Sequence, residues 1–180
     1  AQFLVMDAEN MDFDTDSVDG VLCRWGYMLM GDPVKALKET RRVLKPGGRL
    51  CFSVFAGAEQ NPWASVPTKA LISSGFMDAP APNSPGILAL GDKERLQNIL
   101  DEVGFSNHLV EEVPLTWRFR HFEDYWLFLT ELAGAIATLI ESLPLTDQIA
   151  AKNAIYNSVK SFETEAGIEL PGLTINVATQ

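Results

Sequence analysis

The residues best suited to chemistry lie in two short stretches, "MDAENM" (Met6–Met11) and "LCRWGYMLM" (Leu22–Met30), each at the end of an apolar run. The carboxylate of Asp7 could accept a hydrogen bond from an exocyclic amine or a ribose hydroxyl, and the N–H of Ala8 could donate to a ring nitrogen. The same carboxylate could instead cap the turn that follows it. A nucleoside-binding turn is therefore one of two interpretations of the first stretch.

The second stretch places Trp25, Tyr27 and Met28 around Gly26, an unusual composition for a loop. Apolar side chains at such a point suit a flat or aliphatic ligand. They could equally form core beneath the segment of residues 57–90, and both roles are compatible for one residue.

Apolar runs alternate with helical patterns along the chain, and together they predict the elements that position these stretches. Asp32-Pro33 is typical of a helix start, and Pro46-Gly47-Gly48 is typical of a helix end. Buried strands are predicted at residues 2–7, 20–25 and 49–55, a further strand at 108–119, and an alternating strand at 173–179. Helices are predicted from Asp32 to Pro46, over 63–73, from Asp92 to Gly104, over 122–143 and over 146–166.

A strand, a helix and a strand with short connections indicate a right-handed parallel crossover. The predicted fold class is therefore α/β, with helices on both faces of a mostly parallel sheet. Ligands of such sheets bind outside the carboxyl ends of the strands, where both stretches lie. We expect one domain over residues 1–180, in which residues 57–90 and 122–166 are insertions that form a cap over the active-site side.

Composition excludes several other classes of protein. The 180 residues carry a net charge of −10, which disfavours nucleic acid or an anionic membrane as the main partner. The longest apolar run, Leu127–Ile140, is too short to span a bilayer. Cys23 and Cys51 have no metal or disulfide spacing, which favours reduced thiols in a cytoplasmic protein. "DTDSVDG" lacks the ligands of a calcium loop, so no metal site is predicted.

At this point a family resemblance becomes visible in the long stretch "DAENMDFDTDSVDGVLCRWGYMLMGDPVKALKETRRVLKPGGRLCFSVF" (Asp7–Phe55). It resembles the second half of the class I S-adenosylmethionine-dependent methyltransferases, of the type that includes the ubiquinone/menaquinone C-methyltransferases. "LALGDKERLQNILDEVGF" is similar to the family's helix after its fifth strand. The resemblance implies an incomplete Rossmann-like sheet with an antiparallel C-terminal strand, and S-adenosylmethionine as cofactor.

The resemblance also implies roles for single residues at the cofactor. Asp7 would accept from the adenine amino group, and the Ala8 N–H would meet the adenine ring. The backbone around Cys23 and Arg24 would approach the methionine end. Catalysis in many members is mainly positioning for in-line transfer, so no general base is assigned; His121 is either a proton acceptor or, as a lone histidine at a helix start, structural.

The acceptor site is expected to be apolar. Tyr27 and Met28 would pack near the adenosine or the transferred methyl group. Trp25, Trp63 and Trp117 would surround a small apolar or aromatic acceptor.

The chain departs from the family in one respect: no Gly-x-Gly-x-Gly loop occurs in it. We expect this loop and two strand–helix units upstream of residue 1, so that the chain reads as an N-terminally truncated methyltransferase without activity. Strand edges left open by the missing units would favour a homodimer. The alternative is a non-catalytic small-molecule-binding or dimerisation module, whereas an oxidoreductase is disfavoured because no Gly-x-Gly-x-x-Gly follows any strand.

Overall fold

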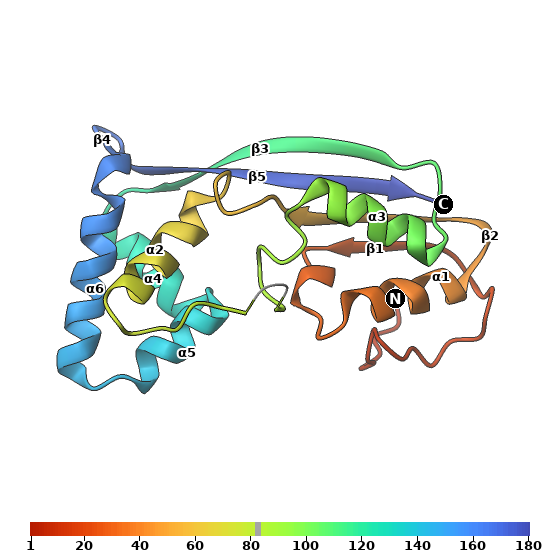
Figure 1. Cartoon of the computed structure of the whole chain (residues 1–180), viewed down its shortest axis with the longest axis horizontal. Helices are drawn as coiled ribbons and strands as arrows, with labels where there is room; N and C mark the ends of the chain where they lie inside the picture. Colours follow the sequence, from red (N-terminus) through yellow and green to blue (C-terminus); the bar gives the residue numbers. More distant parts are fainter. Residues whose placement is uncertain (82–83) are drawn as a thin grey trace. The chain divides into compact units, whose positions relative to one another are not determined.

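The computed structural model describes residues 1–81 and 84–180 (Figure 1). The chain divides into two compact units. The first comprises Ala1–Gly57, Pro82–Pro114 and Leu173–Gln180, and the second comprises Ala58–Ala81 and Leu115–Gly172. The second unit therefore contains most of both expected insertions, while residues 82 and 83 of the first insertion lie outside the described residues.

The elements alternate between strands and helices, as the sequence pattern predicts. The first unit contains β1 (Val18–Arg24), the 3₁₀ turn η1 (Tyr27–Leu29), α1 (Pro33–Val43), β2 (Leu44–Phe55) and α3 (Lys93–Val103). The second contains α2 (Pro62–Ser73), α4 (Phe122–Glu131), α5 (Gly134–Ser142), α6 (Leu145–Val159), η2 (Lys160–Phe162) and β4 (Glu163–Thr164). Two long strands, β3 (Leu109–Phe119) and β5 (Gly167–Thr179), contribute residues to both units.

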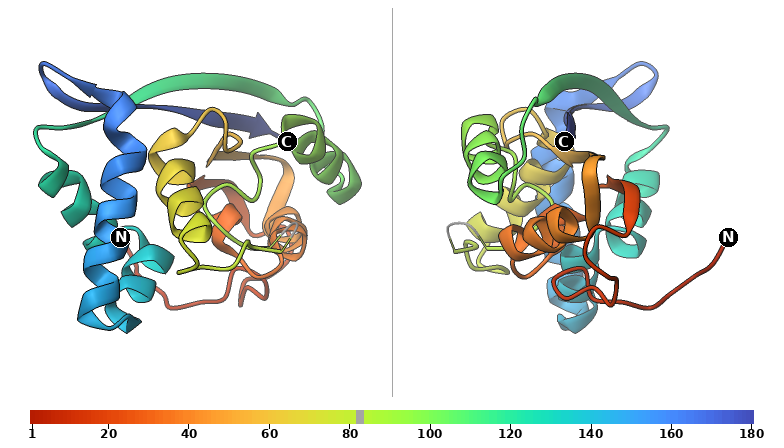
Figure 2. Two further views of the ribbon diagram at one scale, coloured as in Figure 1. Left: turned by 60° about the vertical axis from the view of Figure 1, so that its left-hand side comes forward. Right: turned by 90° about the vertical axis from the view of Figure 1, so that its right-hand side faces the viewer.

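The strands form one mixed sheet in the order β1-β2-β5-β3, with β4 paired to β5. β1 runs parallel to β2, and β5 runs antiparallel to β2. This confirms the α/β class and the antiparallel C-terminal strand, but the sheet is mixed rather than mostly parallel, since β5 runs antiparallel to both β2 and β4. Leu50, Val54 and Ile175 are fully buried on the covered face of the sheet, and α1 and α3 pack against each other on one side of it (Figure 2).

Helix α1 begins as predicted. The Asp32 side chain accepts from the Lys35 N–H at 3.0 Å, and Pro33 occupies the first helical position, where a missing N–H costs nothing. Leu37 and Val43 are buried along its inner face. The local signals suffice here because cap, proline and apolar face all favour the same element.

The segment Pro46-Gly47-Gly48 does not end this helix, which stops earlier, at Val43. Instead it forms a bulge inside β2, where the pairing with β1 jumps from Val18↔Leu44 to Gly20↔Arg49. Gly47 has a φ of 79°, a conformation that glycine adopts without steric cost. The turn is thus part of the strand rather than a separate connection.

Residues 2–7 do not form the predicted buried strand. Residues 1–6 have no regular structure, and Phe3 and Val5 are 94% and 108% exposed. Figure 2 draws this segment as an extended tail. A strand is stable only where a neighbour completes its hydrogen bonds, and none of the strands of the described chain pairs with it.

Strand β1 is also less buried than predicted. Gly20, Leu22 and Arg24 are exposed, and Leu22 is 83% exposed. Alternation of this kind is typical of a strand covered on one face only. The apolar composition of residues 20–25 therefore predicted burial on both faces of the strand, whereas one face is exposed.

Two predicted helices have different bounds. The single helix over 122–143 is broken between α4 and α5, where Gly134 adopts a φ of 31°. The helix over 146–166 begins at Leu145 and ends at Val159, since Glu163-Thr164 pairs with Gly167-Ile168 to start the final hairpin. Apolar spacing alone could not locate either break.

Candidate functional site

Asp7 and Ala8 lie in a tight turn at the end of the N-terminal tail. The Asp7 carboxylate accepts from the Glu9 N–H at 2.9 Å, and the Asn10 N–H donates to the Asp7 carbonyl at 3.1 Å. The turn-capping interpretation of Asp7 is thus confirmed. The cap engages one carboxylate oxygen, Oδ1, and the side chain is exposed, so Asp7 remains accessible to a ligand.

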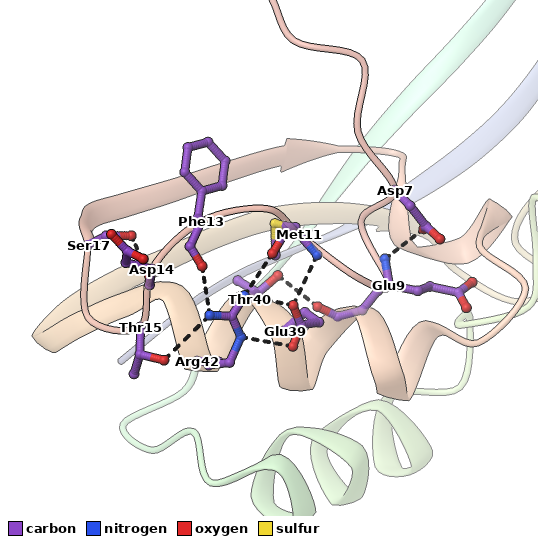
Figure 3. A network of polar contacts seen from close by, with 11 residues as sticks. Asp7, Glu9, Met11, Phe13, Asp14, Thr15, Ser17, Glu39, Thr40 and Arg42 are labelled. Carbon is purple, nitrogen blue, oxygen red and sulfur yellow. Dashed lines mark hydrogen bonds and ion pairs between the residues drawn. The ribbon is translucent and has the colours of Figure 1, made fainter.

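This turn and the loop after it are held by side chains of α1 and of the loop itself (Figure 3). Glu9 accepts from the Asp32 N–H at 2.8 Å, at the start of α1. The Met11 N–H donates to Glu39 at 3.0 Å, and the Met11 carbonyl accepts from Arg42 at 2.9 Å. Both backbone groups of Met11 are therefore bound by the same pair of α1 side chains.

Arg42 makes further contacts with the loop. Its Nη1 donates to the Phe13 carbonyl at 2.7 Å and to the Thr15 hydroxyl at 3.4 Å. Its Nε and Nη2 donate to the two oxygens of Glu39 at 3.0 and 2.9 Å. The hydrogen bond from Arg42 lowers the pKa of the Glu39 carboxyl and raises that of the guanidinium. Both side chains lie outside the apolar face of α1, where helical spacing alone predicts contact with water, and no local signal in the sequence indicates this network.

The carboxyl end of β1 carries Cys23, Arg24 and Trp25. Trp25 has a φ of 54°, an uncommon conformation for a bulky residue, and its N–H donates to the Ser53 carbonyl at 2.9 Å. Its ring stacks on Phe55 at 4.8 Å between centroids, with the Arg24 guanidinium 4.7 Å from the ring centroid. The indole Nε1 is buried and has no hydrogen-bond partner within the described residues. Strain and an unpaired donor at a strand end are features of functional sites.

Beside this strand end, the sheet surface is hollowed by a shallow depression of about 390 Å³. Cys23, Arg24, Ser53 and Asn176 contribute to its lining, together with Glu111. The depression extends over β1, β2, β3 and β5 within the first unit. It brings the two predicted residues Cys23 and Arg24 together, but neither Asp7 nor Ala8 lines it.

Tyr27 and Met28 lie in η1 and are each only 2% exposed. The Tyr27 hydroxyl bonds the Thr40 hydroxyl at 2.6 Å, and burial raises the pKa of Tyr27 to about 12. The Met28 carbonyl accepts from the Gly86 N–H at 3.0 Å. Both side chains are thus core of the first unit beneath residues 84–90, the second of the two roles that the sequence left open.

Trp63 and Trp117 belong to the second unit, where their ring centroids lie 4.6 Å apart. Phe128 lies 6.0 Å from the Trp63 ring and 5.1 Å from the Trp117 ring. The Tyr125 hydroxyl donates to the Trp63 carbonyl at 2.6 Å. The Nε1 of Trp117 is buried and unpaired within the described residues. Neither unit by itself contains all three tryptophans of the expected acceptor pocket, because Trp25 belongs to the first.

His121 precedes α4, and its N–H donates to the Asp124 carboxylate at 3.2 Å. This is the geometry of a helix cap, which favours the structural role for His121. Over residues 1–81 and 84–180, no group of three or more His, Cys, Asp or Glu side chains is arranged to hold a metal ion. None of the helices in these two ranges is long and apolar enough to cross a bilayer.

Part of this sequence is similar to known proteins. A family model described as a methyltransferase domain matches residues 1–52. A demethylmenaquinone methyltransferase from Clavibacter sepedonicus is 32% identical over 133 residues, which cover 64% of this chain and 50% of that protein. A ubiquinone/menaquinone biosynthesis C-methyltransferase from a Marinomonas species is 30% identical over 114 residues, covering 58% of this chain and 45% of that protein. The chain thus spans about half the length of these curated relatives.

Solved structures share the fold. A methyltransferase candidate from Bacillus halodurans superposes with a TM-score of 0.59 at 19% identity, over 99% of this chain and 76% of that one. The YcgJ protein from Bacillus subtilis superposes with a TM-score of 0.57 at 15% identity, over 96% of this chain and 67% of that one. The family match and the two curated relatives make this chain similar to class I S-adenosylmethionine-dependent methyltransferases over part of its length, and the solved structures share its fold.

Proposed function

We propose that this chain carries part of a site for the transfer of a methyl group from S-adenosylmethionine to a small apolar or aromatic acceptor. In this reaction a nucleophilic atom of the acceptor attacks the methyl carbon, and S-adenosylhomocysteine leaves with the electron pair of the broken carbon–sulfur bond. The observation that carries the proposal is the strained end of β1, which lies, like the Asp7 turn, within the residues 1–52 that match the methyltransferase domain.

The residues present fit the adenosine half of the cofactor. The exposed carboxylate of Asp7 would accept from the adenine amino group, and the Ala8 N–H would donate to the ring. The backbone of Cys23 and Arg24 would approach the methionine end. Tyr27 and Met28 would act from inside the core, because their buried side chains fix the turn that follows β1.

The acceptor is proposed to bind at the tryptophan pair of the second unit. Trp117 presents a buried indole N–H without a partner in the described residues, and Trp63 stacks close to it. Aromatic faces with a free donor suit a flat ring that carries an oxygen. The names of the two curated relatives refer to quinones, which supports an acceptor of that class. We further propose that the second unit carries the acceptor-binding residues.

We propose that these 180 residues alone do not catalyse the transfer, because no Gly-x-Gly-x-Gly loop occurs among them to approach the cofactor. A second candidate function is a non-catalytic binding or dimerisation module. It is favoured by β1, which pairs with β2 alone among the described strands and exposes Leu22. An unpaired edge of this kind favours a homodimer through strand edges. A cytoplasmic location is proposed from the free thiols of Cys23 and Cys51.

Calorimetric titration of the 180-residue chain with S-adenosylhomocysteine tests the cofactor site, and transfer of labelled methyl from S-adenosylmethionine to a demethylated quinone tests activity. We expect weak binding that Asp7→Asn reduces further, with no measurable transfer. Asp12→Asn, in the same exposed loop, is the matched control and should leave binding unchanged. Tight binding with turnover would refute the proposed inactivity, and equal binding by Asp7→Asn would refute the role of Asp7.

A further inference from the structure

Residues 7–17 form a loop with no helix or strand except for one isolated bridge between Asp7 and Asn10. Such a segment makes few hydrogen bonds of its own, so its conformation depends on groups outside it. The external groups that bind it are concentrated on one element, α1. The turn proposed to contact adenine is therefore ordered by a helix rather than by the sheet.

Arg42 is the centre of this arrangement (Figure 3). Its guanidinium donates to the carbonyls of Met11 and Phe13 and to the hydroxyl of Thr15, three loop acceptors on three alternate residues. The planar guanidinium of arginine has five N–H donors, so it can bind these three acceptors and both oxygens of a carboxylate at once. The ammonium group of lysine has only three donors on one nitrogen and cannot.

Glu39 fixes the orientation of the Arg42 guanidinium. It binds Arg42 through both oxygens, and its Oε2 also accepts from the Met11 N–H at 3.0 Å. The side chains of Arg42 and Glu39 are only 33% and 20% exposed, so the pair is not a solvated surface ion pair. The two residues therefore hold Met11 through both its N–H and its carbonyl, which belong to consecutive peptide groups.

A second attachment lies at the other end of α1. The Glu9 carboxylate accepts from the Asp32 N–H at 2.8 Å, immediately before the helix. The Asp7–Asn10 turn is thus tied through Glu9, and the following residues are tied through Arg42. Through both attachments, α1 and the residue before it hold the loop at two points.

We infer that Arg42, oriented by Glu39, is a positioning residue for the turn that carries Asp7 and Ala8. The inference rests on the proposed function of this turn in adenine binding. Arg42 touches no proposed ligand atom and acts through Met11, three residues after Ala8. Loss of the Arg42 side chain should make the turn less ordered and weaken binding of the cofactor, while α1 stays folded.

Amide hydrogen exchange followed by NMR tests this inference without requiring activity. We expect Arg42→Lys to accelerate exchange of the Met11 amide by about tenfold, because the lysine cannot reproduce the planar guanidinium. The Thr40 amide, inside α1, should be unaffected. Arg41→Lys is the matched control, because the Arg41 guanidinium donates to the Gly104 carbonyl at 3.4 Å and not to the loop. This variant should leave Met11 exchange unchanged. If Arg42→Lys fails to fold, Glu39→Gln serves as the second variant, with a smaller acceleration expected.

Binding of S-adenosylhomocysteine separates this inference from the proposed function. If the wild-type chain binds, Arg42→Lys should bind about tenfold more weakly and Arg41→Lys equally well. If the wild-type chain does not bind, the proposed cofactor site of this chain fails, and Met11 exchange alone decides on Arg42. The inference would be overturned if Arg42→Lys left Met11 exchange unchanged. It would also be overturned if exchange became faster while the variant bound S-adenosylhomocysteine as tightly as a wild-type chain that binds it.

Discussion

The hydroxyl of Tyr27 lies 2.6 Å from that of Thr40 in the core of the first unit. Thr40 has one hydroxyl proton and donates it to the Ala36 carbonyl at 2.9 Å, so Tyr27 must donate to Thr40. Tyr27→Phe removes this donor and leaves a buried acceptor, which should lower the free energy of unfolding by about 1–2 kcal/mol. Urea denaturation measures the change, and Tyr156→Phe, at a half-buried tyrosine of the second unit, is the control. An equal loss in both variants would contradict a specific role for the Tyr27–Thr40 bond.

The same tyrosine predicts a loss of stability at alkaline pH. Burial raises the pKa of Tyr27 to about 12, above the ordinary value of 10.0 that applies in the unfolded chain. As the pH rises from 10 towards 12, the unfolded state releases this proton while the folded state keeps it, so the free energy of unfolding falls. Tyr27→Phe lacks this proton and should show a smaller decline over the same interval. Parallel stability profiles of wild type and variant, measured by urea denaturation at each pH, would contradict the prediction.

The Cys23 side chain leaves no room for a side chain at position 26, which is glycine. A Cβ at position 26 would lie 2.6 Å from the Cys23 sulfur, closer than van der Waals contact allows. Gly26→Ala should therefore destabilise the first unit by about 1–3 kcal/mol through overpacking at the end of β1. Gly86→Ala is the matched control, because nothing lies within 4 Å of the added methyl group. Thermal unfolding compares the two, and adding Cys23→Ala to Gly26→Ala should restore part of the loss.

Local signals in the sequence predicted those elements whose ends carry their own chemistry. α3 begins where the Asp92 carboxylate accepts from the Arg95 N–H at 2.8 Å, and it ends at Gly104 with a φ of 91°. Both features are properties of single residue types, and neither depends on distant contacts. The start of α1 was predicted from the same kind of signal at Asp32 and Pro33, whereas its end was not.

Features that depend on distant partners could not be predicted in this way. Residues 2–7 have the composition of a strand but no partner strand in the described chain, so their composition was misleading. Arg42 and Glu39 occupy the polar face of α1, where spacing predicts solvent, and only the folded loop shows that they bind Met11. At the candidate site, the sequence located the end of β1, but burial of Tyr27 became evident only from the structure.

The open edge of β1 leads to a prediction about assembly. Leu22 is 83% exposed on a strand that pairs with β2 alone among the described strands, so a second copy could add a strand there. If the proposed homodimer forms at this edge, Leu22→Lys should convert it to a monomer, since a charged lysine opposes strand addition. Leu29→Lys changes another exposed leucine, 57% exposed and outside any strand, and should leave the dimer intact. Light scattering at micromolar concentration distinguishes the two states. A wild-type monomer, or dissociation by both variants alike, would show that β1 is not the dimer interface.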